Sequence, residues 1–356
     1  VNLKIVRRGV QDPLVFTVKR DKIPILSLDA SYMIQPKTGY IRINRFGATT
    51  AEEFKKAMKE LQKQGMKDMI LDLQGNGGGY LNAAIDLANE FLGQKELIVY
   101  TEGRTAQRSE FFAKGNGEFR DGRLIVLVDE YTASASEIVS GAVQDWDRGI
   151  IVGRRSFGKG LVQRPIDLPD GSMIRLTIAR YYTPAGRCIQ KPYDSSTDYN
   201  KDLIDRFNHG ELMNADSIHF PDSLKVQTKK LGRTVYGGGG IMPDYFVPID
   251  TTLYTDYHRN LVAKGAVIKF TMKFIEGHRK ELANKYKKFE SFNEKFIIDD
   301  DMLATLREMG EKEGVKFNEE QYQKSLPLIK TQLKALIARD LWDMNEYFRV
   351  MNTTNE

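Results

Sequence analysis

The pattern that most constrains the fold is a repeated alternation of short apolar runs with helix-like segments. Residues 69–73 and 124–128 are nearly continuous apolar runs of strand length, which is typical of strands buried on both faces. Residues 80–92 and 135–146 have the length and composition of helices. Strands that alternate with helices in this way predict an α/β core with parallel strand pairing.

The segments on either side of this core have different patterns. Residues 1–30 alternate like short strands, and the chain is β-rich again after Lys159. Residues 191–235 are polar and irregular, which predicts an inserted surface excursion. From residue 251 to the end the spacing of apolar residues is helical, and Pro327 is expected in the first turn of the last long helix. We therefore expect three regions, namely 1–30, 31–250 and 251–356.

The composition argues against several classes of function. Lysine and arginine exceed aspartate and glutamate by only 53 to 48, and no arginine-rich run is present, so nucleic acid is not an expected partner. The longest apolar runs are strand-sized, so no membrane span is predicted. The four histidines are scattered without the spacing of metal ligands, and we expect neither a metal nor another cofactor.

The single cysteine, Cys188, excludes an internal disulfide framework and a cysteine-rich zinc site. Its neighbour Arg187 would favour a reactive thiolate, whereas burial would make the same residue an inert thiol. Both interpretations remain open at this point.

The expected topology brings three loops to one edge of the sheet. The run 124–128 leads to Ser134 at its carboxyl end, and a helix of about 12 residues then runs back ~18 Å. A following strand returns the chain ~16 Å, so a right-handed crossover places residues 154–160 beside Ser134. The glycine-rich turn 75–79 follows the carboxyl end of another strand. Because ligand sites of open α/β sheets lie along this edge, we expect a site here.

Ser134 and Lys159 could together form a nucleophile and its base. A serine hydroxyl needs a base to attack a carbonyl group, and a lysine can serve only as a neutral amine in a site shielded from water. Phe157, Gly158 and Gly160 surround Lys159 with apolar or small groups that are compatible with such shielding.

An acyl transfer also needs donors for the negatively charged oxygen that develops on the substrate carbonyl. The backbone N–H of Ala135, at the start of the predicted helix, is one candidate. Gly78 is the second, because a glycine backbone can approach a substrate closely.

Each of these features also has a purely structural interpretation. Residues 134–137 read Ser-Ala-Ser-Glu, which fits a capping box, so Ser134 could simply cap the helix. Lys159 could be a solvated surface lysine, and residues 75–79 could be any tight turn.

Two other kinds of site compete for the same residues. Residues 153–160 differ by one residue from the nucleotide-binding loop G-x-x-x-x-G-K-[ST], with Gly160 in place of the hydroxyl that binds magnesium. Pro165 would also interrupt the helix that this loop requires. A triad based on histidine would need a distant residue, since the first 208 residues contain no histidine.

Taken together, the motifs resemble those of the carboxyl-terminal processing peptidases, or tail-specific proteases, which are relatives of the tricorn core. The matching residues appear in family order over roughly residues 39–250. They are Gly39-Tyr40-Ile41-x-Ile43-x-x-Phe46, Leu71-Asp72-Leu73 with its glycine turn, Ser134-Ala135-Ser136-Glu137-Ile138, Gln144-Asp145, Phe157-Gly158-Lys159-Gly160-x-Val162-Gln163, Tyr182-Thr183-Pro184-x-Gly186-Arg187-x-Ile189-Gln190 and Gly240-Ile241-x-Pro243-Asp244.

The resemblance implies a crotonase-like (ClpP/crotonase) α/β core and a role for particular residues. It makes Ser134 the nucleophile and Lys159 the base, and it makes Gln163 the residue that orients the lysine amine. Ala135 and Gly78 would supply the N–H groups of the oxyanion hole. Asp145 matches a supporting position, for which a structural role on the helix is the alternative.

The sequence departs from the family in three places. Gln74 and Gly77 stand where the family usually has an arginine and a proline. Residues 191–235 intervene where the family runs on within a few residues. Residues 1 to about 23 look like the last strands of the PDZ domain that precedes the core in this family, so we expect a longer protein with its export signal outside this sequence.

The function implied by the resemblance is that of a serine endopeptidase in the cell envelope or periplasm. Its partners would be proteins or peptides cleaved through an acyl-enzyme, often at their carboxyl-terminal tails, and a homo-oligomer is compatible with the family. The alternative is a catalytically silent module of the same fold that captures peptides.

Overall fold

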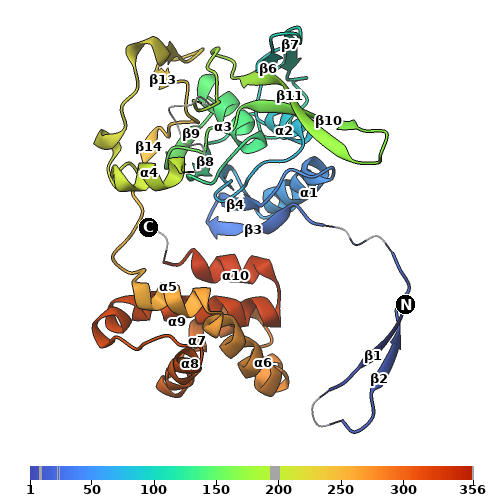
Figure 1. Cartoon of the computed structure of the whole chain (residues 1–356), viewed down its shortest axis with the longest axis vertical. Coiled ribbons are helices and arrows are strands. Elements are labelled where there is room, and N and C mark those ends of the chain that lie inside the picture. The colour runs from blue at the N-terminus through green and yellow to red at the C-terminus, as the bar shows by residue number, and fades with distance from the viewer. Residues whose placement is uncertain (8–9, 22, 24, 193–200, 355–356) are drawn as a thin grey trace.

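The computed structural model describes residues 1–7, 10–21, 23, 25–192 and 201–354. Figure 1 shows an α/β body in the upper half of the view, a helical body below it, and a separate hairpin near the N-terminus. No helix among the described residues is long and apolar enough to cross a membrane.

The centre of the α/β body is a six-stranded sheet in which five neighbouring strands are parallel. Three helices follow successive strands of this sheet, and their apolar faces pack into its core. The predicted α/β core with parallel pairing is therefore confirmed. In spatial order the strands are β14 (Tyr245–Phe246), β9 (Ile150–Gly153), β8 (Leu124–Val128), β5 (Asp68–Asp72), β4 (Thr38–Ile43) and the antiparallel β3 (Leu28–Gln35); the helices are α1 (Thr50–Lys63), α2 (Leu81–Asn89) and α3 (Ala135–Asp145).

A second sheet, of four antiparallel strands, packs on α2 and α3. Its strands are β10 (Leu161–Asp167), β11 (Met173–Tyr182), β6 (Leu97–Glu102) and β7 (Ser109–Phe112), in that order. Helix α3 contacts strands of both sheets, and the Trp146 indole N–H just after it donates to the Leu97 carbonyl at 2.7 Å. The outer part of the β10–β11 hairpin projects beyond the body (Figure 1).

The excursion expected at 191–235 contains more regular structure than its polar sequence indicates. Its described part includes α4 (Asp202–Asn208), two short 3₁₀ turns at Ala215–Ser217 and Asp222–Leu224, and the strand pair β12 (Lys225–Gln227) and β13 (Thr234–Tyr236). Residues 193–200 of the excursion lie outside the described residues. The helix was missed because its seven residues are too few for a clear apolar period.

Six helices with an apolar core of their own form the lower body. They are α5 (Asp256–Ala263), α6 (Ala266–Lys285), α7 (Phe289–Lys295), α8 (Asp300–Lys312), α9 (Glu319–Leu341) and α10 (Met344–Met351). Helix α10 packs on β3, where the Ser31 N–H donates to Asn345 Oδ1 at 2.8 Å and the Arg42 guanidinium lies 4.6 Å from the Phe348 ring centre.

The expectation for Pro327 was wrong, because this proline lies well inside α9. The helix begins at Glu319, where the side chain of Asn318 caps it by accepting the Gln321 N–H. Burial of Ile329 and Leu333 on the same helix offsets the cost of an internal proline, which is about 3 kcal/mol.

The N-terminal hairpin consists of β1 (Asn2–Ile5) and β2 (Leu14–Thr17), whose side chains are mostly exposed. It stands apart from both bodies in Figure 1. Strand β3 of the large sheet begins at Leu28, within the region 1–30 expected to precede the core. Assignment of this region to a PDZ domain stays a proposal, as does the division into three regions.

Candidate active site

Three loops meet at the carboxyl edge of the parallel strands. The glycine turn 75–79 follows β5, the loop 129–134 follows β8, and the loop 154–160 follows β9. The Gly75 N–H donates to Asp129 Oδ1 at 2.9 Å, and the Phe157 N–H donates to the Thr132 carbonyl at 2.9 Å. The structure thus brings together the loops that the sequence places at this edge.

Asp129 and Thr132 fasten these loops to one another. Asp129 Oδ1 also accepts the backbone N–H groups of Tyr131 and Thr132 at 3.0 Å. The Thr132 hydroxyl donates to the Leu73 carbonyl at 2.9 Å, at the end of β5. Burial raises the pKa of the Asp129 carboxyl, and these donors oppose the rise. These hydrogen bonds join the loop that carries Ser134 to the glycine turn and to the end of β5.

Ser134 is the N-cap residue of α3 and has an unusual backbone conformation. Its φ of 57° and ψ of −113° lie in a region that residues other than glycine rarely adopt. Such a conformation costs about 1–3 kcal/mol and is most common at functional sites. The Glu137 half of the expected capping box is present, whereas the Glu137 N–H bonds to the Ser134 carbonyl and not to its side chain; a helix cap by itself also needs no positive φ. Ser134 is half-buried at the sheet edge.

A single buried carboxylate joins the loop of Ser134 to the loop of Lys159. Oε2 of Glu137 accepts the backbone N–H groups of Ser134 at 2.7 Å and Lys159 at 2.9 Å. Oε1 accepts the Gly158 N–H at 2.7 Å and the Ser156 hydroxyl at 2.5 Å. Complete burial raises the pKa of the Glu137 carboxyl, and the four donors oppose this rise.

Glu137 was not among the site residues that the sequence predicted. Its only signal was the capping-box spacing from Ser134, which accounts for one of its four hydrogen bonds. The other three come from residues 19 to 22 positions further along the chain. Only the folded crossover brings them to the same carboxylate.

Lys159 is half-buried beside a cavity of about 720 Å³. Its ammonium group makes no ion pair or hydrogen bond with the residues that the structure describes. Gln163, on β10 just past a bulge after Val162, lines the same cavity, as does Gln190. Gln190 Oε1 accepts the Gly160 N–H at 2.9 Å and so supports the chain next to Lys159. Lys159 and Gln163 thus line the same cavity.

The glycine turn touches the start of α3 at Gly78. A Cβ added to Gly78 would lie 2.7 Å from Ser134 Cβ and 2.9 Å from the Ala135 backbone nitrogen, and its φ is +95°. The backbone of Gly78 therefore lies where no other residue fits. Its N–H donates to Asn76 Oδ1 at 2.8 Å, so this expected oxyanion donor is occupied in the present conformation. The Ala135 N–H has no such partner among the described residues.

Asp145 lies at the end of α3 and is fully buried. Its carboxylate pairs with the Arg187 guanidinium and accepts the Ala185 N–H at 2.7 Å. Its backbone carbonyl accepts the Lys229 N–H at 2.7 Å. These contacts fasten the turn 183–187 and the inserted segment to α3, which is the structural role considered for Asp145.

The competing sites do not fit the structure. Strand β10 follows Lys159, whereas a nucleotide-binding loop would continue into a helix, as the departures at Gly160 and Pro165 already indicated. Cys188 is half-buried, and its backbone forms an isolated β-bridge with Tyr182. It is not part of the three loops. Within the described ranges, no group of three or more metal-ligating side chains is present.

Two segments of the chain match known protein families. Residues 37–197 match the family model described as peptidase family S41, and residues 257–343 match a family of unknown function, DUF8443. A carboxyl-terminal-processing protease of Synechocystis sp. is 42% identical over 195 residues, which are 54% of this chain and 45% of that protein. A carboxyl-terminal-processing protease of Picosynechococcus sp. is 46% identical over 155 residues, which are 44% of this chain and 37% of that protein.

A solved structure of a photosystem II D1 C-terminal processing protease is 28% identical, with a TM-score of 0.45 over 68% of this chain and 53% of that chain. The matches cover less than half the length of the two curated relatives. The resemblance indicated by the motifs is nevertheless confirmed over the residues that carry the site. Over residues 37–197 the chain therefore matches peptidase family S41, and the relatives that it resembles there are carboxyl-terminal-processing proteases.

Proposed function

We propose that this chain is a serine endopeptidase in which Ser134 is the nucleophile and Lys159 is the general base. The observation that carries the proposal is the Glu137 carboxylate, which holds the backbones of both residues through one oxygen atom. The unusual backbone of Ser134 and the cavity beside Lys159 support it further. The match of residues 37–197 to peptidase family S41 supports the reaction class.

Acylation begins when the Ser134 hydroxyl attacks the carbonyl carbon of the scissile peptide bond. The neutral Lys159 amine takes the hydroxyl proton as the new C–O bond forms. As the tetrahedral intermediate collapses, the C–N bond breaks and the departing amine takes this proton from Lys159. The substrate's carbonyl side remains as an ester on Ser134.

Deacylation repeats these steps with water in place of the serine. Lys159 takes a proton from the water as its oxygen attacks the ester carbonyl. Collapse of the second intermediate breaks the ester bond and returns the proton to the Ser134 oxygen. Gln163 lines the same cavity as Lys159, and in this proposal its side-chain amide orients the lysine amine.

Two backbone N–H groups stabilise the charge on the substrate oxygen in this proposal. Ala135, at the N-terminus of α3, supplies the first, and its helix position adds favourable electrostatics. Gly78 supplies the second, in contact with the start of the same helix. Its N–H must then be shared with the substrate or released from Asn76 Oδ1 when the substrate binds.

The substrates proposed here are proteins or peptides, often cleaved at carboxyl-terminal tails, as the names of the relatives say of those proteins. The cavity beside Lys159 has an apolar wall of Leu161, Ile178 and Tyr182 and could receive a substrate side chain. On the family resemblance we also propose a crotonase-like core, a PDZ domain ahead of it, and a location in the cell envelope or periplasm.

The proposal is tested by incubating the chain and its Ser134→Ala variant with unfolded casein. Mass spectrometry should detect fragments with the unaltered chain only, and a fluorophosphonate probe should label only the unaltered chain, at Ser134. Equal cleavage by both proteins would contradict the proposal. Binding of casein with neither cleavage nor labelling would favour the silent peptide-binding module instead.

A further inference from the structure

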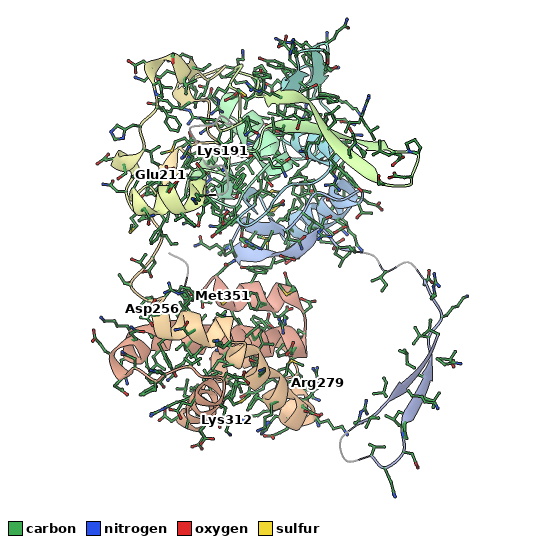
Figure 2. All side chains as sticks on the ribbon, viewed as in Figure 1. Lys191, Glu211, Asp256, Arg279, Lys312 and Met351 are labelled. Carbon is green, nitrogen blue, oxygen red and sulfur yellow. The ribbon has the colours of Figure 1, made fainter. Side chains whose placement is uncertain are left out.

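The loop that leads to Lys159 is held in part by the segment 191–235, which intervenes where the family resemblance predicts only a few residues. Four consecutive residues, 155–158, each contact residues beyond Gln190. Arg155 donates to the Gly239 carbonyl at 2.9 Å and to Glu211, the Lys191 ammonium lies 4.0 Å from the Phe157 ring centre, and the Gly158 carbonyl accepts the Lys191 N–H at 2.9 Å. Figure 2 labels Lys191 and Glu211 on this flank of the upper body.

Arg206, on helix α4 of the inserted segment, contacts the backbone of the same loop. Its guanidinium donates to the Arg155 carbonyl at 2.7 Å, to the Ser156 carbonyl at 3.2 Å and to Glu211 Oε1 at 2.9 Å. The residue is only 4% exposed. A planar guanidinium can hold two carbonyls and a carboxylate at once, which a lysine ammonium on a flexible chain does not reproduce.

Ser156 connects Arg206 to the catalytic loop. Its carbonyl is held by Arg206, and its hydroxyl donates to Glu137 Oε1 at 2.5 Å while accepting the Ile241 N–H at 2.7 Å. The other oxygen of Glu137 accepts the Lys159 N–H. Arg206 therefore acts on the loop through the same carboxylate that holds Ser134.

Burying the Arg206 guanidinium costs free energy, which is hard to explain if the residue serves only to stabilise the fold. Burial, reinforced by the nearby Arg155 charge, lowers the pKa of the Arg206 guanidinium. Apolar side chains in place of a buried ion pair are often neutral or stabilising. A guanidinium here is best explained by the geometry that it fixes.

We propose that helix α4 of the inserted segment positions Lys159 for catalysis and that Arg206, on this helix, is the positioning residue that does so. The inference rests on the proposed peptidase function and extends it to a part of the chain that has no assigned role. Arg206 does not touch the reacting atoms; it fixes the loop on which the general base is carried.

The test compares Arg206→Met and Arg206→Lys with the unaltered full chain on one peptide substrate. For Arg206→Met we expect kcat to fall about 10- to 100-fold, since small misplacements of a catalytic group cost about this much, with KM changed less than about 3-fold. Arg206→Lys should stay impaired, because lysine keeps the positive charge but lacks the planar guanidinium that holds two carbonyls and a carboxylate. The pH–rate profile should change shape, since the surroundings of the Lys159 amine change.

A second readout does not depend on activity. The amides of Gly158 and Lys159 are bonded to Glu137, and their hydrogen exchange reports how firmly the loop is held. In Arg206→Met we expect these two amides to exchange about 10-fold faster or more.

Arg148→Met is a matched control. Arg148 also clamps backbone carbonyls, with bonds of 3.1 Å to Phe91, 3.0 Å to Gly122 and 2.8 Å to Phe119, and burial lowers the pKa of its guanidinium too. It lies before β9, at the amino edge of the sheet and away from the three loops. Its loss should alter stability but leave kcat, the pH–rate profile and the Lys159 amide unchanged.

The outcomes separate the inference from the function on which it rests. Unchanged kcat and unchanged amide exchange in Arg206→Met would overturn the inference while leaving the peptidase proposal intact. Full rescue by Arg206→Lys would also overturn it, because charge alone would then suffice. Absence of Ser134 labelling in the unaltered chain would overturn the peptidase proposal and, with it, the catalytic part of the inference. If Arg206→Met fails to fold, Arg206→Lys and the exchange measurement decide the question.

Discussion

The backbone N–H groups of Ser134 and Lys159, residues 25 positions apart in sequence, donate to the same oxygen atom, Oε2 of Glu137, at 2.7 and 2.9 Å. The distance between the two loops is thus set by one carboxylate rather than by the flexible side chains that would carry out the reaction. Because all four contacts of the carboxylate are donors, the group must act as a pure acceptor, which an ionised carboxylate does.

Glu137→Gln should therefore reduce peptidase activity strongly, by about 100-fold or more. The amide nitrogen would face two of the four donors, and each unsatisfied buried donor costs about 1–3 kcal/mol. We expect lower kcat together with a lower melting temperature, measured by peptide hydrolysis and calorimetry. Ser140→Ala serves as a control, since its buried hydroxyl on the same helix bonds only to helix carbonyls. Equal kcat in both variants would contradict a positioning role for Glu137.

Ser134→Ala should abolish hydrolysis and probe labelling while the protein stays folded. The variant removes the attacking oxygen and loses at most a helix cap, which is worth about 0.5–2 kcal/mol. Ser136→Ala is the comparison, because this neighbouring hydroxyl is buried and donates to the Asn76 carbonyl at 3.1 Å. Retained turnover in Ser134→Ala together with lost turnover in Ser136→Ala would show that the nucleophile is misassigned.

The core and the meeting of the three loops could be predicted from the sequence because they follow from local pattern and handedness. Buried parallel strands have continuous apolar sequences, and a right-handed crossover leaves little choice about where Lys159 arrives. Ser134, Lys159 and Gly78 could therefore be placed at one edge before any contact was known.

Glu137 and Arg206 could not be found in this way, because their significance depends on partners distant in sequence. Glu137 has the local signature of a capping residue, and Arg206 lies in a short helix within a polar segment. The Asn76 side chain that occupies the Gly78 N–H also gives no sequence signal, since glycine-rich turns adopt several conformations. The prediction for Pro327 failed for a different reason. Proline disfavours the interior of a helix, but tertiary packing overrides this local preference in α9.

Lys159→Arg should be nearly as damaging as Lys159→Met. Arginine keeps the positive charge but does not release its proton near neutral pH, so it cannot act as a base. Stopped-flow measurements of acylation by the two variants and the unaltered chain check this prediction, and substantial activity in Lys159→Arg would remove lysine from the mechanism.

Gly78→Ala should inactivate the protein, whereas Gly77→Ala should be tolerated. A Cβ on Gly78 would lie 2.7 Å from the Ala133 carbonyl oxygen and from Ser134 Cβ, at a φ of +95°. A Cβ on the adjacent Gly77 meets no atom within 4 Å and its φ is not in the left-handed region. Peptide hydrolysis and melting temperature of the two variants provide the measurement. Similar activity in both would mean that contact between the glycine turn and α3 is not required.

The helical body should lose stability in mildly acidic solution because of His258. This side chain is 1% exposed, its Nε2 lies 2.7 Å from Gln332 Oε1, and its Nδ1 is buried without a partner. Burial lowers the pKa of His258 below its ordinary value, so the folded protein favours the neutral ring. The unfolded chain takes up its proton near pH 6.5, before the folded chain does.

The stability that His258 contributes is therefore fully present above about pH 6.5 and is lost as the pH falls towards the lower pKa of the folded state, at no more than about 1.4 kcal/mol per pH unit. His258→Gln removes the titrating group, so its melting temperature should vary less between pH 7 and 5 than that of the unaltered chain. His278→Gln is the control, because His278 is an exposed histidine of the same body. If the unaltered chain and His258→Gln lose stability in parallel over this range, another group must titrate, and His258 is tolerated in its protonated form.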